Sequence, residues 1–317
     1  MTGEPIDDGD FSGLVADAQA VFDASAAKPL RDAWAGLDLP QVRADLIERF
    51  KAAGIADAEI DARFMLAHVL APASYAEALA DPALCSWERI SLLADLAWER
   101  LKRKPMAQVL GSQAFWTLDL LVTEDTLTPR PDTESLVETV LKTCTQDVAH
   151  LVDFGTGTGA ILLALLSERP GWTGTGVDLS AAALEVARHN ARRCGLDERS
   201  RWMEARWGAS LDDESIDILV SNPPYIASEV LAGLEPEVRV HEPQMALDGG
   251  PDGLTAYREI CGDAMRLLRP GGWLAVEIGY DQAQSVSDLF TGAGLQAVRS
   301  VRDLAGHDRV VIGQRPS

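Results

Sequence analysis

Three short segments of this sequence contain residues that could form a reactive site. The first is a glycine-rich loop, Gly155-Thr-Gly-Thr-Gly159, which follows an apolar segment of strand type and opens a segment of helix type. Glycine lets a ligand approach the backbone closely, and the free N–H groups at a helix start favour electron-rich ligands. The loop therefore predicts a site for a nucleotide-like cofactor.

The second segment is Gly176-Val-Asp-Leu-Ser180, in which Asp178 ends the next expected strand. A carboxylate about twenty residues beyond such a loop can accept hydrogen bonds from both hydroxyls of a ribose. NAD and S-adenosylmethionine both carry this ribose. Gly155, Gly157 and Ala160 also satisfy the Gly-x-Gly-x-x-Ala spacing of dinucleotide-binding proteins. These two segments leave both cofactors open.

The third segment, Asn222-Pro-Pro-Tyr225, follows the expected strand 216–221 and distinguishes between the two cofactors. Consecutive prolines fix the backbone and remove its N–H groups, so the carbonyl before them faces no competing donor. The Asn222 side-chain oxygen and one backbone carbonyl could together hold both hydrogens of a planar NH2 group. The pattern indicates a transferase that acts on an amide or an exocyclic amine, and it disfavours hydride transfer.

Alternating strands and helices are expected to position these segments. The expected strands are 150–154, 173–178, 201–204, 216–221, 273–278, 295–301 and 309–312, with helices such as 160–168, 181–194 and 256–268 between them. This alternation predicts an α/β fold with a mostly parallel sheet covered on both faces. Only residues 303–308 separate the last two strands, so these should pair antiparallel. Seven strands with an antiparallel last strand are typical of Rossmann-like class I methyltransferases.

The part of the chain before residue 129 has a different pattern. Residues 1–38 are acidic and rich in Ala, Asp and Gly, and we expect a loosely ordered extension there. Apolar residues recur at helical spacing across 39–112, which predicts a small helical domain. The extended pattern of residues 113–128 predicts a hairpin that links the domains. We expect the methyltransferase domain at 129–317.

The composition limits the possible partners. The 317 residues are 47% hydrophobic and 24% charged, as in folded proteins with a substantial core. The net charge of −21 repels phosphates, so we expect no direct nucleic acid partner. The apolar stretches are too short to cross a bilayer and the N-terminus lacks a secretory pattern, so we expect a cytoplasmic protein without membrane contact. The cysteines and histidines lack ligand spacing, and we expect no metal.

The combined segments resemble the PrmC/HemK family of release-factor glutamine methyltransferases over residues 105–313. The segments that carry the resemblance are Leu127-Thr-Pro-Arg-Pro-Asp-Thr-Glu134, Asp153-Phe-Gly-Thr-Gly-Thr-Gly159, Val220-Ser-Asn-Pro-Pro-Tyr-Ile226, His241-Glu-Pro243, Ala246-Leu-Asp-Gly-Gly-Pro-Asp-Gly-Leu254 and Glu277-Ile-Gly279. The resemblance implies methyl transfer from S-adenosyl-L-methionine to the side-chain amide nitrogen (N5) of the glutamine in the Gly-Gly-Gln motif of peptide chain release factors. The product would be S-adenosyl-L-homocysteine, and residues 39–112 would recognise the release factor.

The resemblance also implies the roles of single residues. The implied cofactor-binding residues are Phe115, Gly155, Thr156, Gly157, Gly159, Asp178, Trp207 and Asn222. The implied substrate-binding residues are Asn222, Pro223, Pro224 and Tyr225, and of these Asn222, Pro223 and Tyr225 are the expected catalytic residues. Trp207 is expected near the adenine. Arg206 precedes it where the family usually has an acid, so we expect Arg206→Asp to tighten cofactor binding.

Other functions remain open from the sequence. The nearest alternative is a methyltransferase for a glutamine of a ribosomal protein, although Leu234-Glu-Pro-Glu-Val-Arg239 resembles the release-factor branch more closely. An adenine-N6 methyltransferase could use the same Asn-Pro-Pro-Tyr segment, but it would need base flipping, and the acidic charge disfavours it. An NAD-binding oxidoreductase and an inactive binding module are further alternatives. The intact glycine loop, Asp178 and Asn222 disfavour the inactive module.

Overall fold

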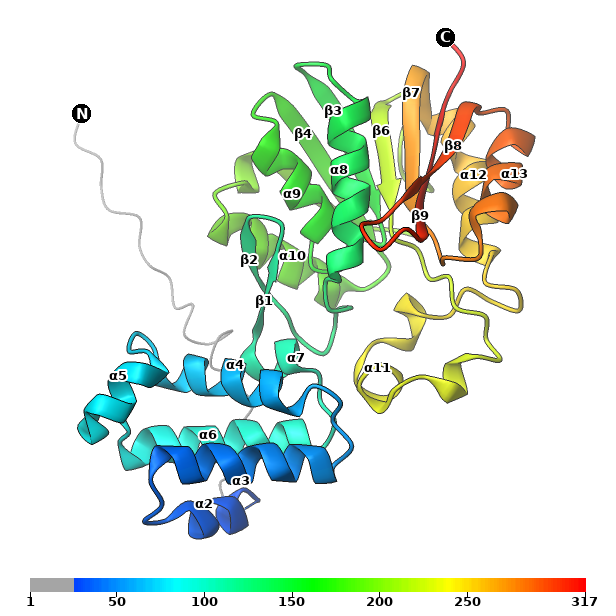
Figure 1. Cartoon of the computed structure of the whole chain (residues 1–317). Helices are drawn as coiled ribbons and strands as arrows, with labels where there is room; N and C mark the ends of the chain where they lie inside the picture. The colour runs from blue at the N-terminus through cyan, green and yellow to red at the C-terminus, as the bar shows by residue number, and fades with distance from the viewer. Residues whose placement is uncertain (1–25) are drawn as a thin grey trace, which may run out of the picture. The chain divides into compact units, whose positions relative to one another are not determined.

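The computed structural model describes residues 26–317, and the chain divides into two compact units, Met1–Gly111 and Ser112–Ser317 (Figure 1). Each unit has its own apolar core. The described core residues of the first unit run from Ala27 to Val109, and those of the second from Phe115 to Ile312. Within residues 26–317, we find no helix with both the length and the apolar content that a membrane span requires.

The first unit is helical. Its helices are α2 (Lys28–Trp34), α3 (Leu39–Ala52), α4 (Ala58–Leu70), α5 (Tyr75–Ala80), α6 (Trp87–Leu101) and α7 (Met106–Leu110), with a short 3-10 turn at Pro82–Leu84. Apolar residues one turn apart, such as Leu46 and Phe50 on α3, are fully buried. Asp38 begins α3 by accepting a hydrogen bond from the Gln41 backbone N–H at 2.8 Å. This arrangement follows the helical spacing of the sequence.

Helix α2 lies inside the segment 1–38 for which the sequence predicts a loosely ordered extension. Leu30 and Trp34 are 2% and 1% exposed, and the Trp34 Nε1–H donates to Asp45 at 2.7 Å. The expectation therefore fails for Lys28–Trp34, because two large apolar side chains are buried there. Residues 1–25 of the expected extension lie outside the described residues. A helix of only seven residues leaves too short a periodic pattern to be recognised in the sequence.

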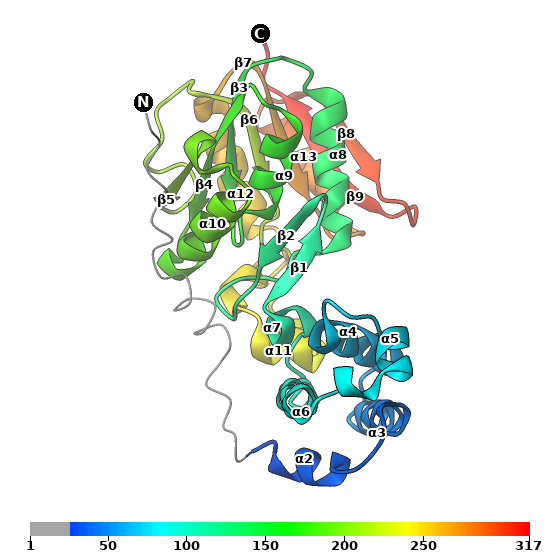
Figure 2. The ribbon, with the colours of Figure 1, turned by 90° about the vertical axis from the view of Figure 1, so that its left-hand side faces the viewer.

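The second unit begins with an antiparallel hairpin of β1 (Ser112–Phe115) and β2 (Leu118–Leu121), which forms a separate two-stranded sheet (Figure 2). Hydrogen bonds from the fully buried Asn190 connect this hairpin to the rest of the unit. Its amide exchanges hydrogen bonds with the Leu121 backbone at 2.7 and 3.1 Å, and its Nδ2–H also donates to the Thr158 carbonyl at 3.0 Å. The hairpin is thus held beside the glycine loop.

The main sheet contains β3 (Ala149–Phe154), β4 (Trp172–Asp178), β5 (Ser200–Glu204), β6 (Ile216–Ser221), β7 (Leu268–Glu277), β8 (Gln296–Arg302) and β9 (Asp308–Gln314). Its strand order is β5-β4-β3-β6-β7-β9-β8, and β9 runs antiparallel to both of its neighbours. The other strand pairs are parallel. The expected seven-stranded, mostly parallel sheet with an antiparallel last strand is confirmed.

Helices cover both faces of this sheet. They are α8 (Glu134–Thr143), α9 (Ala160–Glu168), α10 (Ala181–Arg193), α12 (Thr255–Leu267) and α13 (Ala283–Gly292), and the shorter α11 (Pro236–His241) lies in the connection after β6. Alternate strand residues enter different cores: Leu151 packs with α8 and α9, and its neighbour Val152 packs with α12 and α13. Figure 1 shows α8 and α9 in front of the sheet and α12 and α13 at its right, next to β7 and β8. Strands covered on both faces explain the nearly continuous apolar runs in the sequence.

The strand order creates a switch point between β3 and β6. The chain continues from β3 to β4 and β5 on one side, and from β6 to β7 on the other. In open α/β sheets, ligands bind at the carboxyl ends of the strands where the order reverses. The glycine loop, Asp178 and Asn222 follow β3, β4 and β6 directly, so all three lie at this edge.

Candidate active site

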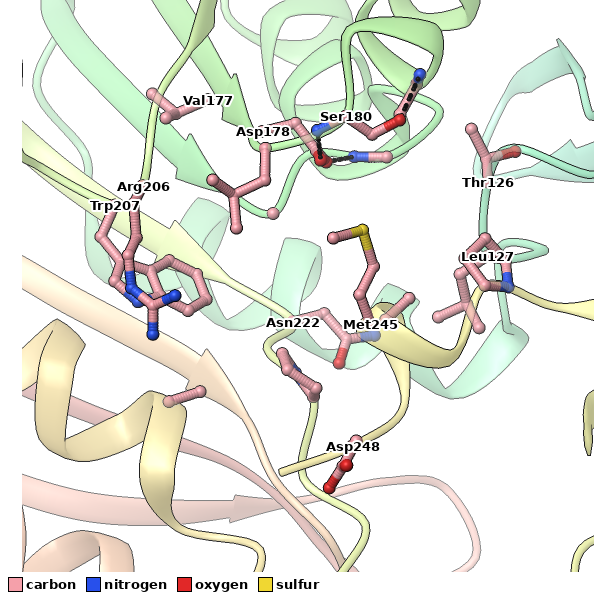
Figure 3. A pocket seen from close by; sticks show the side chains of 18 of the residues that line it. Thr126, Leu127, Val177, Asp178, Ser180, Arg206, Trp207, Asn222, Met245 and Asp248 are labelled. Atoms are coloured by element: carbon pink, nitrogen blue, oxygen red, sulfur yellow. Dashed lines mark hydrogen bonds between the residues drawn. The ribbon is translucent and has the colours of Figure 1, made fainter. Parts of the chain in front are cut away.

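A cavity of about 430 Å³ opens at the switch point of the sheet. Figure 3 shows Trp207 on one side of it, Leu127 on the other and Asn222 between them. The predicted site residues that line the cavity are Gly155, Gly157, Asp178, Trp207, Asn222 and Pro224. Segments far apart in the sequence therefore contribute to one site, as the positions of their strands predict.

The glycine loop has a backbone that only glycine adopts easily. Gly155, Gly157 and Gly159 have φ values of +67°, +53° and +80°, in the left-handed region. A Cβ on Gly159 would lie 2.9 Å from the Trp202 ring, so this position also requires a small residue. The Gly155 backbone N–H donates to the Val177 carbonyl at 2.8 Å, which joins the loop to the end of β4. The loop is thus fixed before any ligand binds.

Asp178 is held by the backbone on both sides of its carboxylate. The Gly157 N–H donates to Oδ2 at 2.9 Å, and the Ser180 N–H donates to Oδ1 at 2.9 Å. Each carboxylate oxygen can accept more than one hydrogen bond. Asp178 therefore presents two oriented acceptors at the cavity wall, which suits a pair of neighbouring hydroxyls such as those of a ribose.

Asn222 is oriented by a buried threonine. Its Nδ2–H donates to the Thr133 hydroxyl oxygen at 3.3 Å, and Thr133 is 4% exposed. This bond directs the amide nitrogen toward Thr133 and leaves the amide oxygen of Asn222 as the acceptor. Ser221 donates its hydroxyl proton to the Phe154 carbonyl at 2.7 Å, which ties the end of β6 to the end of β3. The Asn222 oxygen can thus hold a donor group in the cavity.

Five predicted site residues do not line the cavity, namely Phe115, Thr156, Gly159, Pro223 and Tyr225. Phe115 is 1% exposed and packs in the core with α8 and α9. The Thr156 hydroxyl donates to Asp153 at 2.7 Å, below the loop. Burial raises the pKa of Tyr225 to about 12, so its phenol stays protonated. Their assigned roles stay predictions.

Two buried carboxyl groups lie beneath the site. Asp153 is fully buried at the end of β3, and Glu277 is 1% exposed at the end of β7. Burial raises the pKa of each to about 7. The Thr133 hydroxyl is a hydrogen-bond partner of Glu277, so the residue that orients Asn222 also contacts this carboxyl. The protonation of Glu277 is therefore coupled to the surroundings of Asn222.

Sequence reasoning did not assign two loops that line the cavity, 125–127 and 243–248. Glu242 joins them: it accepts bonds from Arg130 at 2.7 and 2.9 Å and from the Thr128 N–H at 3.3 Å. Burial raises the pKa of Glu242, and the Arg130 guanidinium opposes that effect. The segments Leu127–Glu134 and 241–243 do carry the family resemblance. Because both segments belong to the motifs of one family, their occurrence together in this sequence could have indicated that both loops lie at the site.

Glu259 on α12 is a further cavity residue that the sequence did not indicate. Its carboxylate accepts hydrogen bonds from the Trp207 indole N–H and from the Arg206 guanidinium, the latter at 2.7, 2.8 and 3.1 Å. This contact argues against the expectation that Arg206→Asp tightens cofactor binding, and the effect of the substitution stays a prediction. The substitution would place a second carboxylate beside Glu259, and like charges at this distance repel.

Among residues 26–317, no group of three or more His, Cys, Asp or Glu side chains could hold a metal ion.

The position of β9 beside β7 distinguishes this sheet from the all-parallel sheet of dinucleotide-binding oxidoreductases. Together with Asn-Pro-Pro-Tyr at the switch point, it defines a Rossmann-like methyltransferase. The family model of the methyltransferase small domain matches residues 131–234. The solved hMettl16 catalytic domain in complex with the MAT2A 3'UTR hairpin 6 is similar in fold, with a TM-score of 0.52 and 15% identity over 62% of this chain and 76% of that chain.

Curated relatives narrow the class further. The release factor glutamine methyltransferase of Caulobacter vibrioides is 49% identical over 268 residues, which are 84% of this chain and 92% of the relative. That of Agrobacterium fabrum is 42% identical over 282 residues, which are 86% of this chain and 97% of the relative. The chain belongs to the family of release factor glutamine methyltransferases, and the family expected from the sequence is confirmed.

Proposed function

We propose that this protein transfers a methyl group from S-adenosyl-L-methionine to the side-chain amide nitrogen (N5) of the glutamine in the Gly-Gly-Gln motif of peptide chain release factors. The observation that carries the proposal is the oriented Asn222 amide, whose nitrogen bonds to Thr133 at 3.3 Å while its side chain lines the cavity. The names of the relatives from Caulobacter vibrioides and Agrobacterium fabrum support the choice of substrate.

The cavity fits the methyl donor. Asp178 offers two oriented acceptors for the ribose hydroxyls, and Gly155 and Gly157 let the ligand pass close to the backbone. The Trp207 indole borders the loop, since a Cβ on Gly155 would lie 4.0 Å from its ring, and it offers a surface for the adenine. S-adenosylmethionine supplies an activated sulfonium methyl group, and S-adenosylhomocysteine is the product.

The protein's main task in this reaction is orientation. An amide nitrogen is a weak nucleophile because its lone pair is delocalised over the carbonyl. The Asn222 side-chain oxygen and the Pro223 carbonyl would accept the two amide hydrogens and hold the nitrogen in line with the methyl group. They would also stabilise positive charge that develops on nitrogen. The glutamine nitrogen forms its bond to the methyl carbon as the carbon–sulfur bond breaks, and the surplus proton leaves to water.

The proposed substrate fits the shape of the site. The two glycines before the glutamine give a thin and flexible loop that can enter the cavity. A tripeptide offers little binding area, so we assign recognition of the release factor body to the helical unit around residues 39–112. Since its proposed substrates are translation factors, we place the protein's action in the cytoplasm.

Two variants test the proposed division of roles. Asp178→Ala should weaken S-adenosylhomocysteine binding by about tenfold or more, because a charged acceptor for two hydroxyls is lost. Asn222→Ala should abolish methyl transfer in single-turnover assays, whereas calorimetry should show a change in S-adenosylhomocysteine affinity below about twofold. Tight NADH binding without S-adenosylmethionine binding would contradict the proposal. Full transfer by Asn222→Ala would contradict the role of Asn222.

A further inference from the structure

Glu259, Arg206 and Trp207 form a bonded group at one end of the cavity, and all three line it. Trp207 has a φ of +46°, a left-handed conformation that is uncommon for a bulky residue and needs support from its surroundings. One support is the hydrogen bond from its indole N–H to Glu259. Another is packing against Phe154, with the two ring centroids 5.9 Å apart. The group therefore has a fixed geometry.

The carboxylate of Glu259 has an acceptor position to spare. Its Oε2 accepts from Trp207 and from two Arg206 nitrogens, whereas among residues 26–317 the only donor to its Oε1 is Arg206 Nη2, at 2.7 Å. A carboxylate oxygen can accept two bonds. The hydrogen bond from Arg206 lowers the pKa of Glu259, so the group is ionised at neutral pH. Oε1 can thus accept one further donor at the cavity wall.

This acceptor lines the same cavity as Asp178, the proposed ribose acceptor. The ribose acceptor Asp178 and the Trp207 ring both border the glycine loop, so a base extending from the ribose would lie against the indole. Glu259 is bonded to the edge of that indole. The exocyclic amine of adenine is a donor, and the carbonyl oxygen that replaces it in hypoxanthine is an acceptor.

Building on the function proposed above, we infer that Glu259 accepts a hydrogen bond from the amino group of the cofactor's adenine. It would thereby do what the acid usually found at the position of Arg206 does in the family. Arg206 neutralises Glu259 and holds it against Trp207. In this chain the specificity for adenine therefore comes from α12 and not from the residue before Trp207.

The test compares S-adenosylhomocysteine with S-inosylhomocysteine, in which the adenine amino group is replaced by oxygen. Calorimetry on the full-length wild-type protein should show tighter binding of the amino form by about tenfold or more, because the oxygen of the other form faces a carboxylate. Glu259→Gln presents either a donor or an acceptor, so the preference should fall below about threefold. Glu185→Gln, at another carboxylate paired with an arginine but outside the cavity, should keep the wild-type preference.

Three results would overturn the inference. Glu259→Gln could keep the full preference for the amino form. It could instead weaken both compounds equally, which would mean that Glu259 acts only by holding Trp207. Failure of the wild-type protein to bind either compound would overturn the proposed function as well, so the two failures are distinguishable.

Discussion

Thr133 determines which way the Asn222 amide points. Its hydroxyl oxygen accepts the Asn222 Nδ2–H at 3.3 Å, and its own proton is available to Glu277. Thr133→Val keeps the shape of the side chain and removes both bonds, so the amide can rotate. We expect single-turnover methyl transfer to fall by about tenfold or more, with S-adenosylhomocysteine affinity changed by less than about twofold. Thr133→Ser should retain activity. Equal rates for the Val variant and the wild-type protein would contradict this role.

Glu277 should make the stability of the protein depend on pH. Its pKa rises from 4.5 to about 7 because the carboxyl is buried. Burial therefore favours the protonated form, and wild-type stability should fall as the pH rises from about 4.5 to about 7. Glu277→Gln does not titrate and should gain up to about 3 kcal/mol over wild type near pH 8, with little difference near pH 4.5. Urea unfolding at both pH values measures this. If the difference in unfolding free energy between Glu277→Gln and wild type were the same at both pH values, the role of Glu277 would be contradicted.

Asp178 and Asn222 could be predicted from the sequence because each directly follows or ends an expected strand, and parallel strands bring their carboxyl ends together. Glu259 could not be predicted in this way. It lies on a helix, 52 residues from Trp207, and an acid on the polar face of a helix is ordinarily just solvated. Phe115 was assigned to the cofactor by resemblance alone, and it packs in the core. Side-chain pairing between distant elements is the information that the sequence lacks.

The strands and helices of the second unit were largely predictable, because buried strands and covering helices alternate clearly. The seven strands of the main sheet lie within a few residues of their expected positions, and the antiparallel β9 follows from the short connection at 303–308. The position of β9 between β7 and β8 was not predictable from local patterns, because strand order depends on packing between distant elements. Helix α2 was missed because of its short length.

The glycine loop between β3 and α9 allows a sharp test of its geometry. Gly159→Ala adds both left-handed strain and a contact at 2.9 Å with the Trp202 ring, whereas Gly195→Ala has a similar φ of +67° but no atom within 4 Å. We expect Gly195→Ala to lower the free energy of unfolding by about 1 kcal/mol through strain alone. Gly159→Ala should cost about 1 kcal/mol or more beyond that, through the added overlap. Equal losses for both variants, measured by urea unfolding, would contradict the close packing of this loop.

The whole molecule consists of two units with separate cores. The second unit alone contains every residue that lines the cavity. A variant lacking residues 1–111 should therefore bind S-adenosylhomocysteine within about threefold of the full chain, and yet methylate an intact release factor at least about tenfold more slowly. A short Gly-Gly-Gln peptide should show a smaller difference. Equal rates on the intact factor would exclude a role of the helical unit in substrate recognition.

The most direct test of the proposed function is the position of the transferred methyl group. The full-length protein would be incubated with isotopically labelled S-adenosylmethionine and, separately, with a release factor, ribosomal proteins and DNA, and each product would be analysed by mass spectrometry. We expect one labelled methyl group on the side-chain amide of the glutamine in the Gly-Gly-Gln motif, and none in the Asn222→Ala variant. Label on a ribosomal protein glutamine or on adenine, with the release factor unmodified, would contradict the proposed substrate.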